Sequence, residues 1–550
     1  MPGPLIEAIE GDTIVVNVTN DHPTMVATIH FHGIHQLGTP WSDGPAQITQ
    51  CPLGALQTQE YRFKAFPPGT HYWHAHAVMD VADGLSGPII IHPKEESTTL
   101  EYDDERILFL QDFYSETGEQ QRAGLDNFPF TWIGNPDSLL INGKGLAAAC
   151  AMEGADPVVV CLDTCNDTLA WLPTIEVEAN MTYRIRIINS GQLIFQNVAI
   201  VGHNMTIVEI EGTIIETPIT VANYDVAPGQ RVSVLITTDQ EPGSYLIETS
   251  VRERNITGLF GRAILQYTSV EKSLPTVSPE HPLWNASDEG KAIQDSLLTL
   301  DASSYPEAVA LQTSEDKVER WVIVGTQNLK LDENGQPMQL RWACNNISDV
   351  KPSEPLIARA VRLARENGWP TDLGDTYLDV PQLPPTTWNY SDLIDNGPGP
   401  NLGESGTAVI RLKEGQVFEI VLQNVRALNG AAEFHPWHVH GHSFWVVGRG
   451  EGTYDAETDV ATYNLENPLL RDTATLWPLG WTALRMVAQP GVWLFHCHLT
   501  SHMIMGMGLA LVVEPEALDN PPAEIAFCGN LGSASPADSG NSSSPGADNK

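Results

Sequence analysis

WLFHCHLTSHMIMGMG, residues 493–508, places a cysteine, Cys497, directly between two histidines. Another histidine, His502, follows five residues after the cysteine, and Met507 follows ten residues after it. A thiolate, imidazoles and a weak thioether form the ligand set of a blue-copper electron-transfer site. Successive side chains of an extended segment point to opposite faces. The stretch therefore predicts a strand that holds a copper ion on one face and contacts a second metal centre on the other.

Three further segments are rich in histidine: HFHGIHQLGTPWSDG at 30–44, GTHYWHAH at 69–76 and FHPWHVHGHSFW at 434–445. Each contains histidines two residues apart, which share one face of a strand. A lone histidine is usually a structural residue, but four such clusters among only 17 histidines favour metal binding. Zinc also accepts imidazole and thiolate ligands. Zinc explains neither the His-Cys-His arrangement nor the methionine beyond it.

The order and spacing of the four segments resemble the four copper-binding signatures of the multicopper oxidases, a family that includes laccases, ascorbate oxidases and ferroxidases. The resemblance covers nearly the whole chain. It implies four copper ions per chain, namely one type 1 ion, one type 2 ion and a type 3 pair. The implied type 1 ligands are His435, Cys497 and His502, with Met507 as the axial ligand. The implied type 2 ligands are His30 and His438, and the implied type 3 ligands are His32, His74, His76, His440, His496 and His498.

The remaining histidines match no ligand position of the family, and we interpret them as structural residues. They are His22, His35, His71, His92, His203, His281 and His442.

An all-β fold of three cupredoxin-like domains, which are Greek-key β-sandwiches or barrels, fits both the resemblance and the local patterns. β-Branched, partly alternating segments predict strands, and turn residues lie between them. The clearest such segments are 12–20, 183–190, 231–238 and 416–425. We expect domains at 1–98, 99–270 and 318–528, a polar and irregular linker at 271–317, and a disordered tail at 529–550.

One helix stands out at 353–368, SEPLIARAVRLARENG. Ser353 is a plausible N-cap, Pro355 fits the first turn, and Gly368 can close the C-terminal end. The arginines of this segment recur at i, i+3 spacing. We interpret this stripe as a solvated face.

The distribution of the implied ligands predicts where the trinuclear site lies. Four histidines come from the first expected domain and four come from the third. The site must therefore lie between these domains, and their docking becomes a condition of metal binding. The second domain supplies no ligand, so we expect it to space the other two and to form one wall of the substrate site.

The resemblance implies a reaction in which four one-electron oxidations of a substrate reduce O2 to two water molecules. Electrons would enter at an exposed edge of His502 and pass through Cys497 to the trinuclear site by way of His496 and His498. Oxygen cleavage also consumes protons. Asp43 matches a family carboxylate that can deliver them, although an Asp before Gly44 can also simply form a turn.

The chain departs from the family pattern at Thr500, where many relatives carry Glu or Asp. This departure removes a proton donor and puts turnover at neutral pH in doubt.

The likeness is greater to the ascorbate oxidase branch than to typical laccases, in HGIHQLGTPWSDG, FTWIGNPDSLLINGKG and GWTALRMVAQPGVWLFHCH. Trp132 and Trp342 match two tryptophans that flank the ascorbate pocket of that branch, although a tryptophan is often only a core residue. A laccase-like oxidase of phenols and aromatic amines is the main alternative. A ferroxidase would need acidic residues at the edge of His502. A copper-binding protein without turnover would be expected to lack some ligands, and this chain lacks none.

Composition limits the partners. The formal net charge is −40, from 29 Lys and Arg against 69 Asp and Glu. Such a chain disfavours nucleic acids and anionic membranes, and no apolar run of about 18 residues suggests a membrane span. The same charge opposes long-range attraction of an anionic donor such as ascorbate. Local positive charge at the substrate site or an acidic working pH could relieve this.

Six of the seven cysteines are not implied copper ligands and predict disulfides in an oxidising compartment. The resemblance implies a Cys51–Cys528 bridge, and Cys150 and Cys161 look like a local pair. Cys165 is either free or paired with Cys344. The sequence contains N-x-[ST] sequons at Asn17, Asn166, Asn180, Asn204, Asn255, Asn285, Asn346, Asn389 and Asn541, which suit a secreted glycoprotein.

The first residues, MPGPLIEAIEGD, lack the basic and apolar regions of a signal peptide. In the family, a stretch like this one follows a few dozen residues that contain the first strands. We therefore expect the first domain to lack its N-terminal strands and to have an unpaired strand edge.

Overall fold

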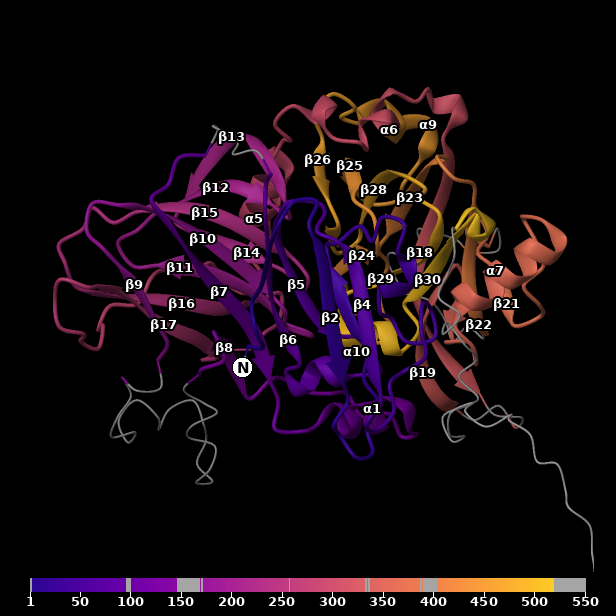
Figure 1. The fold of residues 1–550 in the computed structure, drawn as a ribbon, viewed down its shortest axis with the longest axis horizontal. Helices are drawn as coiled ribbons and strands as arrows, with labels where there is room; N and C mark the ends of the chain where they lie inside the picture. The colour runs from indigo at the N-terminus through magenta and orange to yellow at the C-terminus, as the bar shows by residue number, and fades with distance from the viewer. Residues whose placement is uncertain are drawn as a thin grey trace, which may run out of the picture.

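The structure is a computed structural model. It describes residues 2–94, 100–145, 169, 172–256, 258–331, 334, 337–385, 388 and 403–518. The described strands fall into three groups along the chain, which we call the N-terminal, central and C-terminal units. They span residues 6–92, 104–267 and 319–513. Figure 1 shows the indigo N-terminal unit between the purple central unit and the orange and yellow C-terminal unit.

The N-terminal unit contains a four-stranded sheet, in the order β1-β6-β5-β3, and a two-stranded sheet of β2 and β4. Strand β1 pairs in parallel with β6. The strands are β1 (Ile6–Ile9), β2 (Thr13–Thr19), β3 (Ile29–His32), β4 (Thr58–Lys64), β5 (Gly69–Ala75) and β6 (Ser86–His92).

The central unit stacks a six-stranded sheet, β13-β12-β15-β10-β7-β8, with a five-stranded sheet, β14-β11-β16-β17-β9. Their inner faces share one cluster of buried aliphatic side chains, which includes Ile185, Val234 and Leu265. The strands are β7 (Asp104–Phe113), β8 (Ser138–Ile141), β9 (Thr174–Val177), β10 (Thr182–Asn189), β11 (Phe195–Ile200), β12 (Met205–Ile210), β13 (Thr213–Val221), β14 (Asn223–Val226), β15 (Arg231–Thr237), β16 (Ser244–Arg252) and β17 (Phe260–Tyr267).

The C-terminal unit is a continuous network of 13 strands. Strands β24 and β29 are neighbours near one end of it, and β29 ends at Cys497. The strands are β18 (Glu319–Leu331), β19 (Pro337–Cys344), β20 (Ile347–Asp349), β21 (Tyr377–Asp379), β22 (Glu404–Leu412), β23 (Val417–Gln423), β24 (His435–Val439), β25 (Phe444–Glu451), β26 (Leu469–Arg471), β27 (Thr473–Leu476), β28 (Gly480–Val487), β29 (Gly491–Cys497) and β30 (Gly508–Val513).

All four strand predictions are confirmed. Segments 12–20, 183–190, 231–238 and 416–425 form β2, β10, β15 and β23, with ends that differ by one or two residues. The predicted tail at 529–550 lies outside the described residues.

The expectation of an irregular linker at 271–317 is only partly correct. Residues 267–286 contain no described helix or strand beyond the end of β17, but α5 (Ser287–Ser296) and the short α6 (Ala308–Gln312) follow. Leu297 and Ala310 are buried, so this segment packs onto the units that it connects. The other α-helices in the described part of the chain are α1 (Gly118–Asp126), α7 (Leu356–Asn367), α9 (Ala456–Asp459) and α10 (Thr500–Ile504).

Helix α7 confirms the predicted helix, but the predicted N-cap was wrong. The N-cap is Pro355 rather than Ser353, and Gly368 is the C-cap. The first amides of the helix donate to carbonyl oxygens of the N-terminal unit, from Leu356 to Gln47 and from the next residue to Ile48. A side-chain cap is therefore unnecessary, because another segment already satisfies these groups.

The arginine stripe of α7 is partly solvated, because Arg365 is exposed and the side chains of Arg359 and Arg362 are 27% and 36% exposed, but it also makes polar contacts. Arg359 and Arg362 both pair with Glu354, at 2.7 and 3.4 Å. Arg365 donates to the carbonyl of Leu518 at 3.0 Å. The stripe thus anchors the chain on either side of the helix.

The cysteines decide one open question. Cys51 is disulfide-bonded, and its partner lies outside the described residues, as do Cys150, Cys161, Cys165 and Cys528. Cys344 is free and fully buried in β19. The alternative pairing of Cys165 with Cys344 is therefore wrong.

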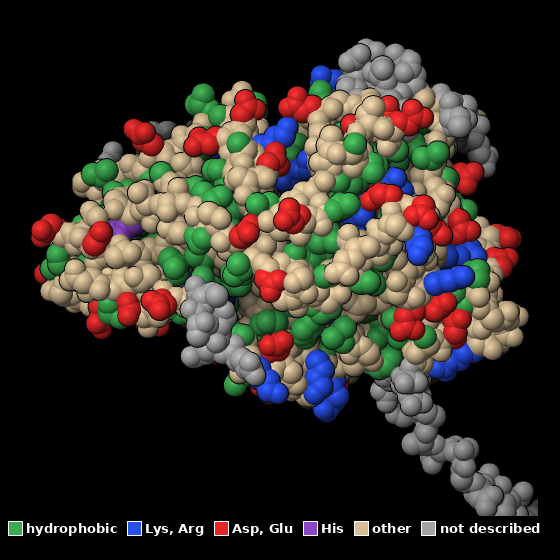
Figure 2. Space-filling view, turned by 90° about the horizontal axis from the view of Figure 1, so that it is seen from above, with side chains coloured by type: hydrophobic (Ala, Val, Ile, Leu, Met, Phe, Trp, Pro, Cys, Tyr) green, Lys and Arg blue, Asp and Glu red, His purple; other side chains and the backbone are tan. Residues whose placement is uncertain are grey.

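No helix among the described residues is long and apolar enough to cross a bilayer. Figure 2 shows Asp and Glu side chains spread across one face of the molecule, as the net charge of −40 requires.

Candidate metal centre

Strand register brings the predicted ligands together from separate parts of the chain. In the N-terminal unit β3 pairs with β5 so that His30 lies opposite His74. In the C-terminal unit β24 pairs with β29 so that His438 lies opposite His496. Because side chains alternate along a strand, the histidines two residues from these positions face the same way. All eight histidines predicted for the trinuclear site converge on the seam between the two units, within clusters of facing ring nitrogens.

The ring nitrogens in this seam face one another without a proton between them. His30 Nε2 lies 3.4 Å from His438 Nε2, and His440 Nε2 lies 3.2 Å from His496 Nε2. In each of these four rings the other nitrogen, Nδ1, already donates to an oxygen, for example from His30 to the carbonyl of Asp43 at 2.8 Å. A neutral imidazole carries one N–H, so the facing nitrogens present lone pairs to each other. Such an arrangement of lone pairs fits a cation bound between the rings.

Burial keeps these rings neutral, which is the form that binds metals. Desolvation lowers the pKa of His74, His76, His440, His496 and His498 well below the ordinary value, and neighbouring histidines lower it further. The Nε2 atoms of His74 and His76 are buried and have no hydrogen-bond partner. The site therefore offers unprotonated nitrogen donors of the kind that copper prefers.

Three side chains form a smaller cluster on the other side of β29. Cys497 Sγ lies 3.7 Å from His435 Nδ1 and 3.8 Å from His502 Nδ1, and the two nitrogens are 3.2 Å apart. A triangle of this size can surround an ion whose bonds to nitrogen and sulfur are about 2.0–2.3 Å long. One sulfur and two imidazoles in a trigonal arrangement are the ligands of blue-copper sites.

Met507 lies beside this triangle along the backbone. Its amide donates to the carbonyl of His502 at 2.9 Å, and its carbonyl accepts from the amide of Cys497 at 3.0 Å. The side chain is 1% exposed and packs against β18, where a Cβ on Gly325 would lie 2.5 Å from the methionine Cε. Two backbone hydrogen bonds and the close contact of its side chain with the backbone at Gly325 thus fix the position of Met507.

The edge of His502 is not exposed, contrary to expectation, because the residue is only 1% accessible. The ring of Trp342, itself buried, lies 4.9 Å from it, and that of the half-buried Trp132 lies 6.0 Å away. Both predicted tryptophans therefore flank this histidine. Glu433 covers its outer nitrogen, with Oε2 at 3.4 Å from Nε2. A donor would contact this cover rather than the imidazole itself.

Arg254 provides a positive charge in the same place, with its guanidinium 5.7 Å from the centre of the Trp132 ring. Burial would raise the pKa of Glu433, but the adjacent His502 and the charge of Arg254 outweigh it and lower the pKa to about 2. Glu433 is therefore ionised at physiological pH. Both residues are half-buried, so they offer one anion and one cation beside Trp132.

Asp43 contacts histidines from both units. Its carbonyl accepts from His30 Nδ1, and its carboxylate Oδ2 accepts from His440 Nδ1 at 2.8 Å. Asp43 is fully buried, and its other carboxylate oxygen has no hydrogen-bond partner. Gly44 follows at a positive φ of 102°. Asp43 therefore both precedes a turn and contacts the predicted ligands.

Thr500 begins α10 and is 7% exposed, with its amide donating to the carbonyl of Gln192 at 3.1 Å.

A second buried carboxylate, Asp472, was not predicted from the sequence. Its Oδ1 accepts from His32 Nε2 at 3.1 Å, which leaves His32 Nδ1 buried and without a partner. Burial would raise the pKa of Asp472, but the adjacent Arg231 outweighs it and holds the pKa well below its usual range. Arg231 comes from the central unit, which supplies none of the predicted ligands.

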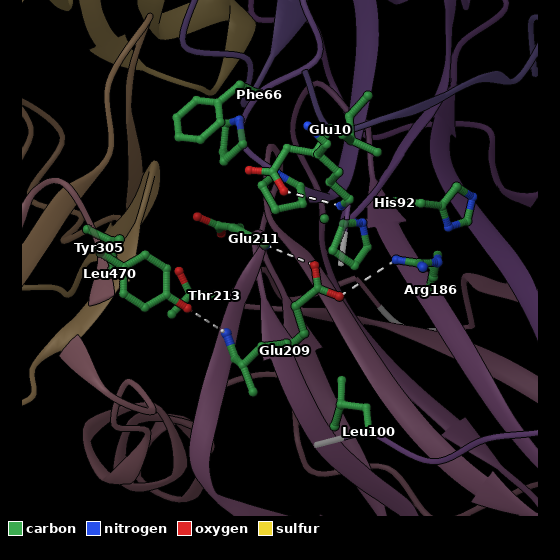
Figure 3. Close-up of a pocket in the computed structure, with 18 of the residues that line it drawn as sticks. Glu10, Phe66, His92, Leu100, Arg186, Glu209, Glu211, Thr213, Tyr305 and Leu470 are labelled. Atoms are coloured by element: carbon green, nitrogen blue, oxygen red, sulfur yellow. Dashed lines mark hydrogen bonds and ion pairs between the residues drawn. The ribbon is translucent and has the colours of Figure 1, made fainter. Parts of the chain in front are cut away.

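Glu211 of the central unit also contacts the segment that carries Asp472, and it lines an open cleft of about 1220 Å³ at the junction of the three units. Figure 3 shows Glu209, Glu211 and Arg186 in this cleft, with Tyr305 on the far wall. None of the predicted copper ligands lines this cleft.

Tyr72 is a further side chain that the sequence did not single out. It precedes His74 by two residues on β5 and so faces the same way. Its hydroxyl lies 3.0 Å from His498 Nε2, and its ring stacks on His32 at 4.6 Å. Burial raises the pKa of the Tyr72 phenol well above its usual range. The signal was present in GTHYWHAH, in the spacing of two that the histidines themselves share.

Other histidines outside the predicted ligand set make structural hydrogen bonds, as expected. Examples are His71 Nε2 to the carbonyl of Pro67 at 2.9 Å, and His442 Nδ1 to the carbonyl of His440 at 2.9 Å.

Comparison with known proteins agrees with this geometry. Three family models, each described as multicopper oxidase, match residues 1–96, 104–269 and 377–517. An L-ascorbate oxidase of Brassica rapa subsp. pekinensis is 37% identical over 96% of this chain and 90% of its own length. Laccase-2 of Oryza sativa subsp. japonica is 34% identical over 96% and 90%.

Among solved structures, Fet3p, a multicopper oxidase that functions in iron import, has the same fold. Its TM-score is 0.72 at 22% identity, over 95% of this chain and 88% of that one. Sequence, ligand geometry and relatives agree that this chain belongs to the multicopper oxidase family, the copper-dependent oxidoreductases that use O2.

Proposed function

We propose that the protein couples four one-electron oxidations of ascorbate to the reduction of O2 to two water molecules. The observation that carries this proposal is the position of Cys497. Its sulfur lies in the triangle with His435 and His502, while the adjacent His496 and His498 face the seam between the units. One short strand thus connects the two clusters.

The proposed type 1 ligands are His435, Cys497 and His502, with Met507 axial. The proposed type 2 ligands are His30 and His438, and the proposed type 3 ligands are His32, His74, His76, His440, His496 and His498. Copper bound there would supply storage for the four electrons that O2 needs. The donor set supports this, because it combines neutral imidazoles with one thiolate.

The residues near His502 support ascorbate as the donor. Ascorbate is an anion at neutral pH, and Arg254 beside Trp132 supplies a local positive charge on a protein of net charge −40. Beside them, Glu433 is ionised, and its Oε2 lies 3.4 Å from His502 Nε2, where the electron would enter. Two relatives named L-ascorbate oxidase, at 37% and 36% identity, agree with this choice.

A laccase-like oxidase remains the alternative, because Trp132 and the half-buried Phe130, whose ring lies 6.4 Å from that of Trp132, present aromatic surface near His502. A ferroxidase is less well supported. Glu433 is the acidic group placed against His502, and the nearby Arg254 would repel a ferrous ion.

Asp43 is proposed to deliver protons to the seam, because its carboxylate joins the hydrogen bonds of His440 and its backbone those of His30. The position of Thr500 offers no second acid. Turnover should therefore depend on Asp43 and fall at high pH.

The protein is proposed to be a secreted glycoprotein of three cupredoxin-like domains at about 1–98, 99–270 and 318–528. The disulfide of Cys51 suits an oxidising compartment. Most of the sequons in the described part of the chain are exposed, namely Asn17, Asn180, Asn204, Asn255 and Asn285.

The test is steady-state oxygen uptake by the copper-loaded protein with ascorbate, a phenol and ferrous iron, from about pH 4 to about pH 8. We expect the highest kcat/KM for ascorbate. Trp132→Ala should raise the KM for ascorbate more than that for the phenol. A preference for the phenol would favour the laccase-like alternative, and a loaded protein with no visible blue absorption would contradict the copper assignment itself.

A further inference from the structure

We propose that Arg231 and Glu211 of the central unit form a clamp on residues 471–473 of the C-terminal unit, and that this clamp orients two ligands of the trinuclear site. The central unit would then be a positioning element for copper rather than only a spacer. The inference rests on the proposed function, because it takes His32 and His438 as copper ligands.

Arg231 reaches from the start of β15 to both other units. Its two terminal nitrogens donate to the two carboxylate oxygens of Asp472, at 2.7 and 2.6 Å. Its Nε donates to the carbonyl of Thr70 in the N-terminal unit at 2.9 Å. Such a two-pronged contact fixes the plane of the carboxylate as well as its position. Arg231 is 1% exposed and Asp472 is 3% exposed, so water does not compete for these bonds.

Asp472 transmits this orientation to His32. The Nε2–H of His32 donates to Asp472 Oδ1 and also lies 3.1 Å from Thr473 Oγ1. A neutral imidazole with its proton on Nε2 has its lone pair on Nδ1. That nitrogen is buried and unpartnered. The Arg231–Asp472 pair thereby selects Nδ1 as the nitrogen of His32 that can bind copper.

The same segment positions His438. Its Nδ1 lies 3.0 Å from the carbonyl of Asp472 and 3.1 Å from Thr473 Oγ1. Residues 472 and 473 therefore hold one predicted type 3 ligand from the N-terminal unit and one predicted type 2 ligand from the C-terminal unit. A shift of this segment would move both rings.

Glu211 fixes the backbone of the segment. One carboxylate oxygen accepts from the amides of Asp472 and Thr473 at 2.9 and 3.0 Å, and the other pairs with Arg471 at 2.5 Å. Glu211 is 4% exposed. Together Arg231 holds the side chain of Asp472, and Glu211 holds the main chain around it.

Buried ion pairs at a seam can also serve docking alone, and the test must separate the two roles. The type 1 site provides an internal reference, because its proposed ligands all lie in the C-terminal unit and do not contact residues 471–473 in the described structure. A clamp that orients His32 and His438 should affect trinuclear copper and leave the blue absorption unchanged.

The experiment removes copper from the loaded full-length protein with increasing concentrations of a chelator. It records total copper per chain and the blue absorption at each step. In Arg231→Met and Glu211→Gln, the chelator concentration that removes the non-blue copper should fall about 10- to 100-fold, as for other residues that orient metal-binding histidines. The concentration that removes the blue absorption should stay as in the wild type.

Matched controls come from the same unit. Arg252 is equally buried and pairs with Asp225 at 3.0 Å, and Glu209 is a buried carboxylate that accepts from the amide of Thr70 at 3.0 Å. Neither contacts residues 471–473. In Arg252→Met and Glu209→Gln, the chelator concentrations that remove the non-blue copper and the blue absorption should differ from each other by as much as in the wild type. If these controls lower the non-blue midpoint as much as the clamp variants do, the clamp is overturned.

A double-variant comparison tests whether Arg231 acts through Asp472. If it does, Arg231→Met with Asp472→Asn should hold copper no more weakly than Asp472→Asn alone, whereas independent roles would add. Additive losses overturn the inference, as does a clamp variant that folds and retains its copper. A wild-type protein that binds no copper would instead contradict the proposed function, and so the two failures are distinguishable.

Discussion

A Cβ on Gly325 would lie 2.5 Å from the Cε of Met507, closer than non-bonded carbon atoms approach. Gly325 belongs to β18, and Met507 follows the type 1 cluster on the way to β30. Because Gly325 has no side chain, the thioether of Met507 can pack directly against β18. This contact therefore influences the position of the sulfur relative to Cys497.

The first prediction follows from this contact. Gly325→Ala should displace the Met507 side chain, and if Met507 is the axial ligand, the type 1 reduction potential should rise because a weak electron donor moves away. A redox titration followed by the blue absorption measures this. Met507→Leu is the reference, since it removes the thioether and keeps the volume. A Gly325→Ala protein with wild-type potential and only a lower stability would show that Met507 does not tune the copper.

The second prediction concerns Arg254. Arg254→Met should raise the KM for ascorbate about tenfold, which corresponds to about 1.4 kcal/mol of binding, because the local positive charge beside Trp132 is lost. The KM for a neutral phenol should stay within about twofold, whereas Arg254→Lys should largely restore ascorbate. These values come from initial rates of oxygen uptake at low and high salt. Equal effects on ascorbate and phenol would mean that Arg254 only packs against Trp132.

The metal ligands could be predicted because they repeat a short-range pattern. Histidines two residues apart on a strand must share a face. Sequence spacing alone therefore places His30 and His32 on one face, and His438 and His440 on one face. The resemblance to a family then supplied which clusters meet. The residues that support them carry no such pattern. Arg231 and Asp472 are 241 positions apart and make a bond only because three units dock.

Burial was the other quantity that local sequence could not supply. The resemblance implied an exposed edge of His502, yet Glu433 and Trp342 cover it in the fold. The arginines of α7 are partly solvated, as their spacing indicates, but their acceptors, Glu354 and the carbonyl of Leu518, lie outside the helix and could not be read from it. In both cases the deciding partner belongs to another element.

The third prediction concerns Thr500. Thr500→Glu should raise turnover above about pH 7, because an additional carboxylic acid near the seam can carry protons that the chain otherwise takes through Asp43. Thr500→Gln is the matched control, since it has the same shape and no ionisable proton. The measurement is kcat for ascorbate from about pH 5 to about pH 9. A glutamate variant whose pH profile coincides with that of the glutamine variant would exclude a proton role for this position.

The last prediction concerns Asp80, a buried carboxyl group of the N-terminal unit. Asp80 is 8% exposed, and its Oδ2 has no hydrogen-bond partner. Burial raises the pKa of Asp80 from 3.8 to about 7. Between these two values the folded protein keeps a proton that the unfolded chain loses. The free energy of unfolding therefore falls as the pH rises through this window.

Asp80→Asn removes the ionisation and keeps the shape, so it should raise the unfolding temperature at about pH 8 and leave it unchanged at about pH 4. A gain of about 2–4 °C is expected for each kcal/mol recovered in a protein with domains of this size. Thermal unfolding of the wild type and the variant at the two pH values measures the difference. Asp316→Asn, at an exposed position, should change neither value. An equal rise of the unfolding temperature at both pH values would show that the variant packs better. It would contradict the prediction that ionisation of the buried Asp80 destabilises the fold.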